Sequence, residues 1–356
     1  MERNRIMWVD TARCICIYFV IITHLESCTS SLYRFYGPFF LTGFLFLSGY
    51  CYKHRDGFLA MLRKKTLQLF IPWLLWGLLS VAFHQLFSGF RKNKDQIMSL
   101  GKELKWFFLQ VRGINDGPWF FAMLFVSFLL FFFLIRFYEK NKSRRAAAPA
   151  LLAALGLLYL AGKLYTSLVP PFSYGTNALP WHLEYLPTSL FFMFLGYLYR
   201  SSGKSDAAAP PLSRAWIPLV YLALVFAPLL FGQRLRLRAP AAQLYEAVSE
   251  YCGVLFVLWL GRLLRPNALT RFMGRNTLLV FPMHVYIYTL FEYALRRFLP
   301  ETYAAILSGA VSSVVFALVF AFVIACVLIL PIMIVNRYFP ILAGKAGQKA
   351  EKQPVS

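Results

Sequence analysis

Three ionisable residues lie within the first apolar segment of the chain, where their side chains could take part in chemistry. Asp10, Arg13 and His24 fall in the run 6–24, which is otherwise rich in Ile, Val and Cys. Arg13 and His24 lie on one face of a helix, since 11 residues make three turns plus about 20°. Asp10 falls within about 60° of the same stripe. An ionisable group inside a spanning helix is costly, so this stripe indicates a functional site that faces the interior of a bundle.

The spacing along this helix limits the chemistry that the stripe could perform. Eleven residues rise about 16 Å, so Arg13 cannot touch His24, and a substrate lying along the helix would meet them at two depths. A neutral imidazole can act as a general base toward a hydroxyl group. A structural alternative stays open, in which Asp10 pairs with Arg13 at i, i+3 and His24 is a helix-end residue near the membrane interface.

The composition places this stripe in a membrane protein. Of the 356 residues, 59% are hydrophobic and 15% are charged, and the mean hydropathy is +0.58. These values exclude a disordered chain, a disulfide scaffold and an ordinary soluble enzyme. Apolar runs between charge clusters predict an all-α, polytopic membrane bundle of about ten transmembrane helices. The predicted spans are 6–24, 36–53, 67–87, 118–138, 146–164, 186–200, 215–232, 245–262, 277–296 and 303–335.

The charges indicate the orientation of the bundle and its domain limits. The net charge is +22, but Lys and Arg gather at the N-terminus and in alternate turns, which is typical of the cytoplasmic side rather than of nucleic-acid binding. We therefore expect both termini to be cytoplasmic. Residues 1–340 are predicted to form one membrane-embedded domain and 341–356 a basic cytoplasmic tail. In the longest loop, the amphipathic stretch 100–111 is expected to lie at the membrane surface.

Several stretches, taken in order, resemble the acyltransferase 3 family of integral membrane acyltransferases over roughly residues 5–335. The first is Asp-x-x-Arg followed by Arg-x10-His, which ends the first span at His24. The others are the Phe-rich run 38–50 that ends in Ser-Gly-Tyr, the cluster 63–65 ahead of Ile-Pro-Trp at 71–73, Gly-Pro-Trp-Phe at 117–120, Phe-Leu-Gly-Tyr at 194–197, and Gly-Arg-Asn-Thr at 274–277 leading to His284. The compact length and the Gly-Pro-Trp-Phe stretch are similar to the fucose 4-O-acetylase-like subgroup.

The resemblance implies an enzyme of the plasma (inner) membrane that moves an acyl group, usually acetyl, from acyl-CoA to a hydroxyl of a sugar or envelope glycan. His24 would be its essential base and Arg13 the partner in the motif. Acetyl-CoA would be a co-substrate rather than a resident cofactor, and the six cysteines show no metal-ligand spacing. The partners implied are the lipid bilayer, acyl-CoA and the glycan acceptor.

The cluster Arg63, Lys64 and Lys65 would hold the phosphates of cytosolic coenzyme A, to which Arg is suited by its bidentate contacts. Positive-inside topology alone explains the same cluster equally well. The sequence also departs from the family pattern, because Gln68 stands where a third basic residue is common.

Four further groups are candidates for supporting roles or for the acceptor site. Trp119 opens a span and is either a wall of the site or an interfacial anchor. Glu250 could accept hydrogen bonds from sugar hydroxyls or lie at an exposed helix start. His284, inside the ninth span, could be catalytic or could bond a backbone carbonyl. His182 and Glu184 are expected in a solvated outer loop.

Two other classes of protein fit parts of the pattern. A transporter or exporter of an envelope glycan would explain the basic, aromatic-rich bundle, but it predicts repeated halves with broken helices, and no such symmetry is visible in the sequence. A membrane scaffold without chemistry would use the polar stripe only to fix helix packing. The enzyme is the favoured interpretation.

Overall fold

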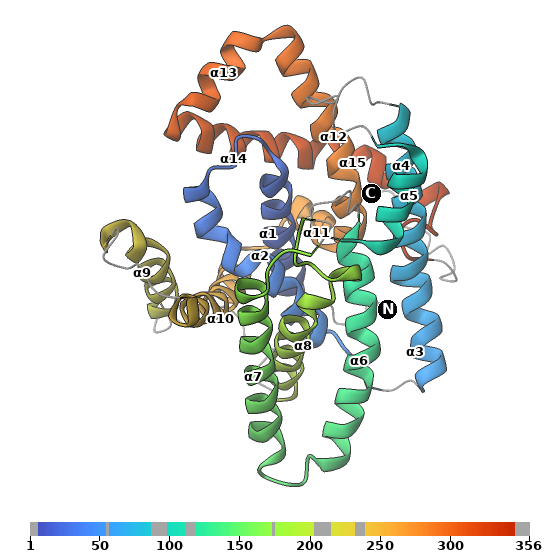
Figure 1. Cartoon of the computed structure of the whole chain (residues 1–356), viewed down its shortest axis with the longest axis vertical. Coiled ribbons are helices and arrows are strands. Elements are labelled where there is room, and N and C mark those ends of the chain that lie inside the picture. Colours follow the sequence, from blue (N-terminus) through green and yellow to red (C-terminus); the bar gives the residue numbers. More distant parts are fainter. Residues whose placement is uncertain are drawn as a thin grey trace.

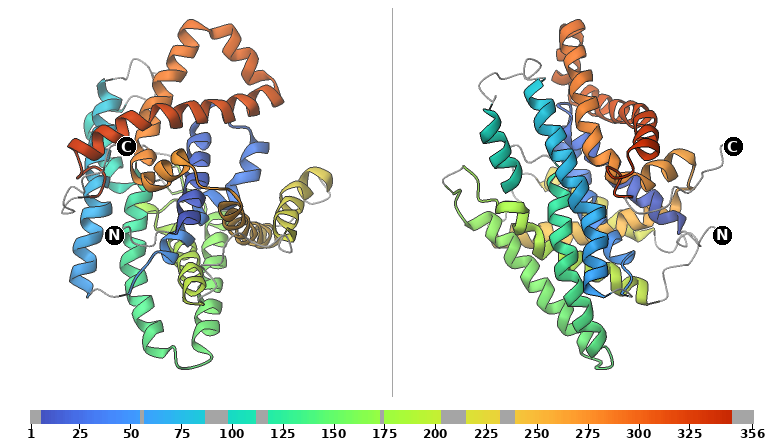
Figure 2. Two further views of the ribbon diagram at one scale, coloured as in Figure 1. Left: turned by 180° about the vertical axis from the view of Figure 1, so that it is seen from behind. Right: turned by 90° about the vertical axis from the view of Figure 1, so that its right-hand side faces the viewer.

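The computed structural model describes residues 6–54, 57–86, 98–111, 118–172, 175–202, 215–231 and 239–345. All regular elements within these ranges are helical, which confirms the predicted all-α fold. At one end of the molecule α6 (Trp119–Asn141) and α7 (Ala147–Leu168) form a long hairpin, and at the other α12 (Thr277–Phe298), α13 (Pro300–Ser308) and α14 (Ala310–Val327) form an arch (Figure 1 and Figure 2).

Each predicted span corresponds to a helix. Besides those already named, the spans are α1 (Met7–His24), α2 (Ser30–Tyr50), α4 (Ile71–Leu86), α8 (Leu186–Ser201), α9 (Trp216–Phe231) and α10 (Ala239–Leu263). The last predicted run is divided at Gly309, which has extended backbone, into α13 and α14, and α15 (Ile329–Tyr338) follows directly.

The described residues contain seven helical segments that are long and apolar enough to cross a membrane. They contain α1, α4, α6, α7, α10, α12 and the pair α14–α15, while α2, α8 and α9 cover the three remaining predicted spans. Many large apolar side chains on these helices are exposed, as expected where they face lipid. The chain is therefore a multi-pass membrane protein.

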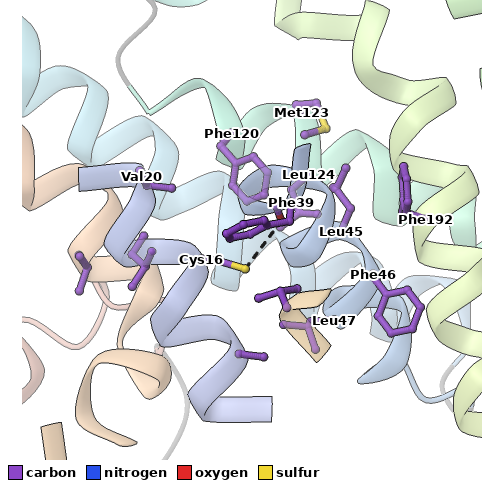
Figure 3. Packing of buried hydrophobic residues seen from close by; sticks show 14 of the residues in the cluster. Cys16, Val20, Phe39, Leu45, Phe46, Leu47, Phe120, Met123, Leu124 and Phe192 are labelled. Atoms are coloured by element: carbon purple, nitrogen blue, oxygen red, sulfur yellow. Dashed lines mark hydrogen bonds between the residues drawn. The ribbon is translucent and has the colours of Figure 1, made fainter. Parts of the chain in front are cut away.

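The polar stripe of the first span lies in the middle of the bundle. α1 contacts α2, α10, α12 and α14, together with α11 (Ala268–Arg275), so most sides of the helix are covered by protein rather than lipid. Figure 3 shows the apolar packing beside it, where Cys16 of α1 lies against Phe39 of α2 and donates a 3.9 Å hydrogen bond to its carbonyl oxygen. This packing holds α1 at a fixed position relative to its neighbours.

α2 and α8 approach each other closely because small residues lie at their contact. A Cβ atom added to Gly196 of α8 would lie 2.0 Å from the carbonyl oxygen of Phe46, and one added to Gly49 of α2 would lie 1.8 Å from that of Met193. Glycine lets two helix backbones meet where no hydrophobic effect drives association. The atoms that an added Cβ would meet belong to the backbone on both helices, so rotation of a side chain cannot relieve the clash.

Two predicted peripheral segments are more closely packed than the sequence suggested. The amphipathic stretch forms α5 (Leu100–Leu109), and its Phe107 fills the space over Gly77 of α4. One side of α5 therefore packs on the bundle, while Leu100 and Phe108 are exposed. Of the predicted tail, residues 341–345 are described, and the carbonyl oxygen of Leu342 accepts a 3.0 Å hydrogen bond from the Trp76 indole. Residues 346–356 lie outside the described residues.

We predict that Gly196→Leu lowers the stability of the bundle by about 1–3 kcal/mol, the usual cost of overpacking. The measurement is the midpoint of thermal unfolding in detergent. Gly101→Ala is the control, because a Cβ atom there meets nothing within 4 Å and should leave the midpoint unchanged or slightly higher. Equal midpoints for Gly196→Leu and wild-type protein would contradict the α2–α8 contact.

Candidate active site

Two histidines from distant parts of the chain meet at the end of α1. Nδ1 of His24 lies 3.2 Å from Nε2 of His284, and the ring centroids are 4.8 Å apart in an edge-to-face arrangement. Each ring is also anchored to its own helix, by the carbonyl oxygens of Val20 at 2.9 Å and Val280 at 3.0 Å. His24 is exposed and His284 is 1% exposed, so one ring is accessible and the other is enclosed.

The short helix α11 sets the height at which α12 meets α1. Asn267 caps α11 in a reciprocal capping box with Thr270, and the helix then packs directly on α1. A Cβ atom added to Gly274 would lie 2.0 Å from the carbonyl oxygen of Asp10, so the two backbones are in contact. α12 therefore begins beside the first half of α1, and its second turn reaches His24.

Asp10 has a structural role in this arrangement. Its carboxylate is buried and lies 3.5 Å from Nε of Arg275, at the end of α11. The Arg13 guanidinium instead donates to Sγ of Cys51 at 3.3 Å. Among the described residues the i, i+3 pair of Asp10 and Arg13 is thus not formed, and the carboxylate instead joins α1 to α11.

The predicted basic cluster is divided between the surface and the interior. Arg63 and Lys64 are exposed on α3 (Phe58–Lys65), whereas the Lys65 ammonium lies 3.4 Å from the centroid of the Phe128 ring. Lys65 is close enough to Arg13 and Lys64 for repulsion between the positive charges. Within the described part of the chain, no salt bridge involves Arg13 or Lys65, so two cations from α1 and α3 converge without a carboxylate.

A single π-helical turn explains why Lys65 turns inward. The turn η1 (Thr66–Phe70) lies between α3 and α4 and changes the rotation of one helix relative to the other. Such insertions occur frequently at functional sites. The sequence alone gave no sign of this turn, so it could not show which cation of the cluster faces Arg13.

Trp119 belongs to a buried aromatic cluster with a histidine and a glutamate. It is the first residue of α6, and its ring centroid lies 4.4 Å from that of His182. His182 Nδ1 lies 3.2 Å from Oε1 of Glu184, and both residues are buried, so the expectation of a solvated loop was wrong. Trp181 and His182 both have left-handed backbone, with φ of 58° and 52°, a strained conformation for such residues.

This aromatic cluster is connected to the histidine pair by packed rings. Phe120 follows Trp119 on α6, and its ring centroid lies 5.6 Å from that of Phe281. Phe281 in turn lies 6.4 Å, between ring centroids, from His284, one turn later on α12. Trp119 thus contributes to the wall that supports α12 and does not itself contact His24 in the structure.

Glu250 takes part in a charge cluster that joins two helices. One oxygen of its carboxylate accepts a hydrogen bond from the Lys163 ammonium, and the other accepts a 2.5 Å hydrogen bond from the Tyr159 hydroxyl. Both carboxylate oxygens are therefore in use. Lys163 also lies 3.0 Å from Glu246. These contacts run between α7 and α10, and they occupy the carboxylate that the sequence offered as a candidate for binding acceptor hydroxyls.

The structure also shows a carboxylate, not indicated by the sequence, that ties α12 to the loop after α1. Glu292, two turns after His284 on α12, accepts a 3.0 Å hydrogen bond from the backbone N–H of Glu26, and Tyr303 donates to it at 3.3 Å. Arg296 pairs with Glu26. The available signal was an ionisable residue, Glu292, within the predicted span 277–296.

Comparison with protein families identifies the class of protein to which the chain belongs. The family model described as an acyltransferase domain, that of acyltransferase 3, matches residues 6–331. The chain belongs to the acyltransferase 3 family, and it is therefore a membrane acyltransferase. Searches among curated proteins and among solved structures found no match. The match runs from α1 to the start of α15 and so includes both histidines and the cations beside Arg13.

We predict that Lys163→Met destabilises the protein by about 3 kcal/mol, because it leaves Glu250 without its cationic partner in a mostly buried setting. The double variant Lys163→Met/Glu250→Leu should recover most of this loss in thermal unfolding. Glu246→Gln is the control, since Glu246 is 53% exposed and its pair contributes within about 1 kcal/mol. Wild-type stability of Lys163→Met would mean that Glu250 does not need Lys163 and remains available for an acceptor.

Proposed function

We propose that the protein is an O-acyltransferase that moves an acetyl group from acyl-CoA to a hydroxyl of a sugar or envelope glycan at the plasma (inner) membrane. The observation that carries the proposal is the pair of His24 and His284 at the end of α1, in a chain that belongs to a membrane acyltransferase family. An exposed imidazole supported by a buried one is a suitable general base for a hydroxyl group.

Arg13 and Lys65 are the residues that we expect to bind the donor. Coenzyme A carries several phosphate charges, and these two cations converge without a carboxylate partner in the described part of the chain. Arg63 and Lys64, exposed in the same last turn of α3, would attract the same phosphates from the cytoplasm. The charge distribution thus supports donor binding at this end of α1.

The spacing on α1 fits a donor that lies along the helix. Arg13 and His24 are on one face, separated by a rise of about 16 Å. With the phosphates of the donor at Arg13 and Lys65, its flexible pantetheine arm would extend toward His24 and present the thioester there. The acceptor would approach from the other end of α1, where the arch of α12, α13 and α14 stands (Figure 1).

His24 would take the proton of the acceptor hydroxyl as its oxygen attacks the thioester carbonyl. The carbon–sulfur bond then breaks, and the departing thiolate receives the proton from the imidazolium, giving the ester and free coenzyme A. A relay through an acyl-histidine would use the same ring. No bound metal or resident cofactor takes part in this scheme.

We predict that His24→Ala reduces acyl transfer by about 10²–10⁴-fold, the usual effect of losing a positioned general base. The assay uses purified protein, radiolabelled acetyl-CoA and a crude envelope glycan extract. His84→Gln is the histidine control, because His84 contacts Glu103 on α5 rather than this site. A folded His24→Ala protein with full activity would refute His24 as the base.

We predict that Lys65→Met weakens binding of radiolabelled coenzyme A by about 10-fold or more, the effect of losing a charge-assisted hydrogen bond. Lys142→Met is the control, because the Lys142 side chain is 61% exposed beside Glu139 at the far end of α6. Equal affinities of the Lys65→Met and wild-type proteins would exclude Lys65 from the donor site, whatever the outcome for His24.

A further inference from the structure

The hydrogen bonds around the histidine pair determine where each ring carries its hydrogen. A backbone carbonyl oxygen can only accept, so Val20 requires the hydrogen of His24 on Nδ1, and Val280 requires that of His284 on Nδ1. Nε2 of His284 then carries a lone pair and lies 3.2 Å from Nδ1 of His24, so it shares the single hydrogen of that nitrogen with the Val20 carbonyl oxygen at 2.9 Å. The remaining lone pair of His24 is on Nε2, the ring nitrogen turned away from His284.

We propose that His284 is a positioning residue of the transfer reaction: together with the Val20 carbonyl oxygen, its Nε2 accepts the Nδ1–H of His24, and Nε2 of His24 takes the proton of the acceptor hydroxyl. This inference rests on the proposed function. It assigns the two nitrogens of His24 different tasks, one directed to α12 and one to the substrate. It also explains why the buried side chain is a histidine, since an apolar residue could pack in the same place but could not accept a hydrogen bond from His24.

The bond between the rings acts more strongly during the reaction than before it. When Nε2 of His24 takes the proton, the ring becomes a cation and its Nδ1–H becomes a charge-assisted donor, roughly twice as strong as a neutral one. His284 is 1% exposed, so the other acceptor for that hydrogen is the Val20 carbonyl oxygen rather than water. Its lone pair therefore stabilises the charged state of His24 that forms in the transition state.

A second tie between the same two helices keeps the rings at this distance. Two residues after His24, the backbone N–H of Glu26 is bonded to Glu292, which lies two turns after His284. The side chain of Arg296 bridges both carboxylates, pairing with Glu26 and lying 3.8 Å from Glu292. α12 is thus held both to His24 at the end of α1 and to Glu26 in the loop that follows, and the two contacts keep the base in register with its supporting group.

Two substitutions of His284 separate the proposed role from packing. The oxygen of His284→Gln can take the place of Nε2 and accept from His24. The amide of His284→Asn can take the place of Nδ1 and donate to Val280, but it offers His24 no acceptor. We expect His284→Gln to keep kcat within about 10-fold of wild type and His284→Asn to lose about 10²-fold or more, with the affinity for radiolabelled coenzyme A unchanged in both.

The inter-ring bond can also be measured without activity. The chain has five histidines, so solid-state NMR of protein labelled with 15N-histidine in lipid can resolve them, with His24→Gln and His284→Gln proteins assigning the two rings. We expect His24 to carry its hydrogen on Nδ1 and to show 15N–15N coupling to His284 across the bond. The coupling should be absent from the His284→Asn protein.

The outcomes distinguish this inference from the function on which it rests. Wild-type kcat in His284→Asn, or a wild-type spectrum with no coupling between the rings, would overturn the role of His284 while leaving acyl transfer by His24 intact. A wild-type protein that shows the coupling but transfers no acyl group would overturn the proposed function, and the role of His284 with it.

Discussion

Every polar group that α1 carries into the bundle must find a partner there, because lipid offers none, and the rest of the structure is arranged around this constraint. Asp10 meets Arg275, Arg13 meets Cys51, and His24 meets His284. The three partners come from three different elements of the chain. The polar stripe therefore fixes which helices surround α1 and at what height each of them lies.

Much of the fold could be predicted from the sequence, because spanning helices are marked by long apolar runs, and these are local signals. The division of the last run at Gly309 and the docking of α5 through Phe107 could not, since both depend on contacts with other helices. Burial of His182 and Glu184 was missed for the same reason. Polar residues near a span end indicate a loop unless a distant aromatic residue such as Trp119 covers them.

Within the candidate site, the residues were easier to predict than their partners. His24 and His284 were both singled out as ionisable groups in spans, but they are separated by 260 residues. The height at which they meet is set by tertiary contacts, among them that of Gly274 with the backbone of Asp10. Nothing in the sequence distinguishes Lys65 from Arg63 and Lys64, because a π-helical turn decides which side chain faces Arg13. Glu250 was a candidate for binding the acceptor hydroxyls, but its carboxylate forms an ion pair with Lys163, which the sequence did not indicate.

The two halves of the proposed site depend on different kinds of constraint. The distance from Arg13 to His24 is set by the rise of a single helix, so neighbouring elements cannot change it without breaking α1. The distance from His24 to His284 is set by packing, through α11 below and the contact of Glu26 with Glu292 above. The rigid helix α1 therefore sets the distance that the donor must span between Arg13 and His24. The proton transfer is sensitive to small changes in the distance between His24 and His284, and tertiary contacts set that distance. Substitutions in α11 or around Glu292 should therefore act on the chemical step rather than on donor binding.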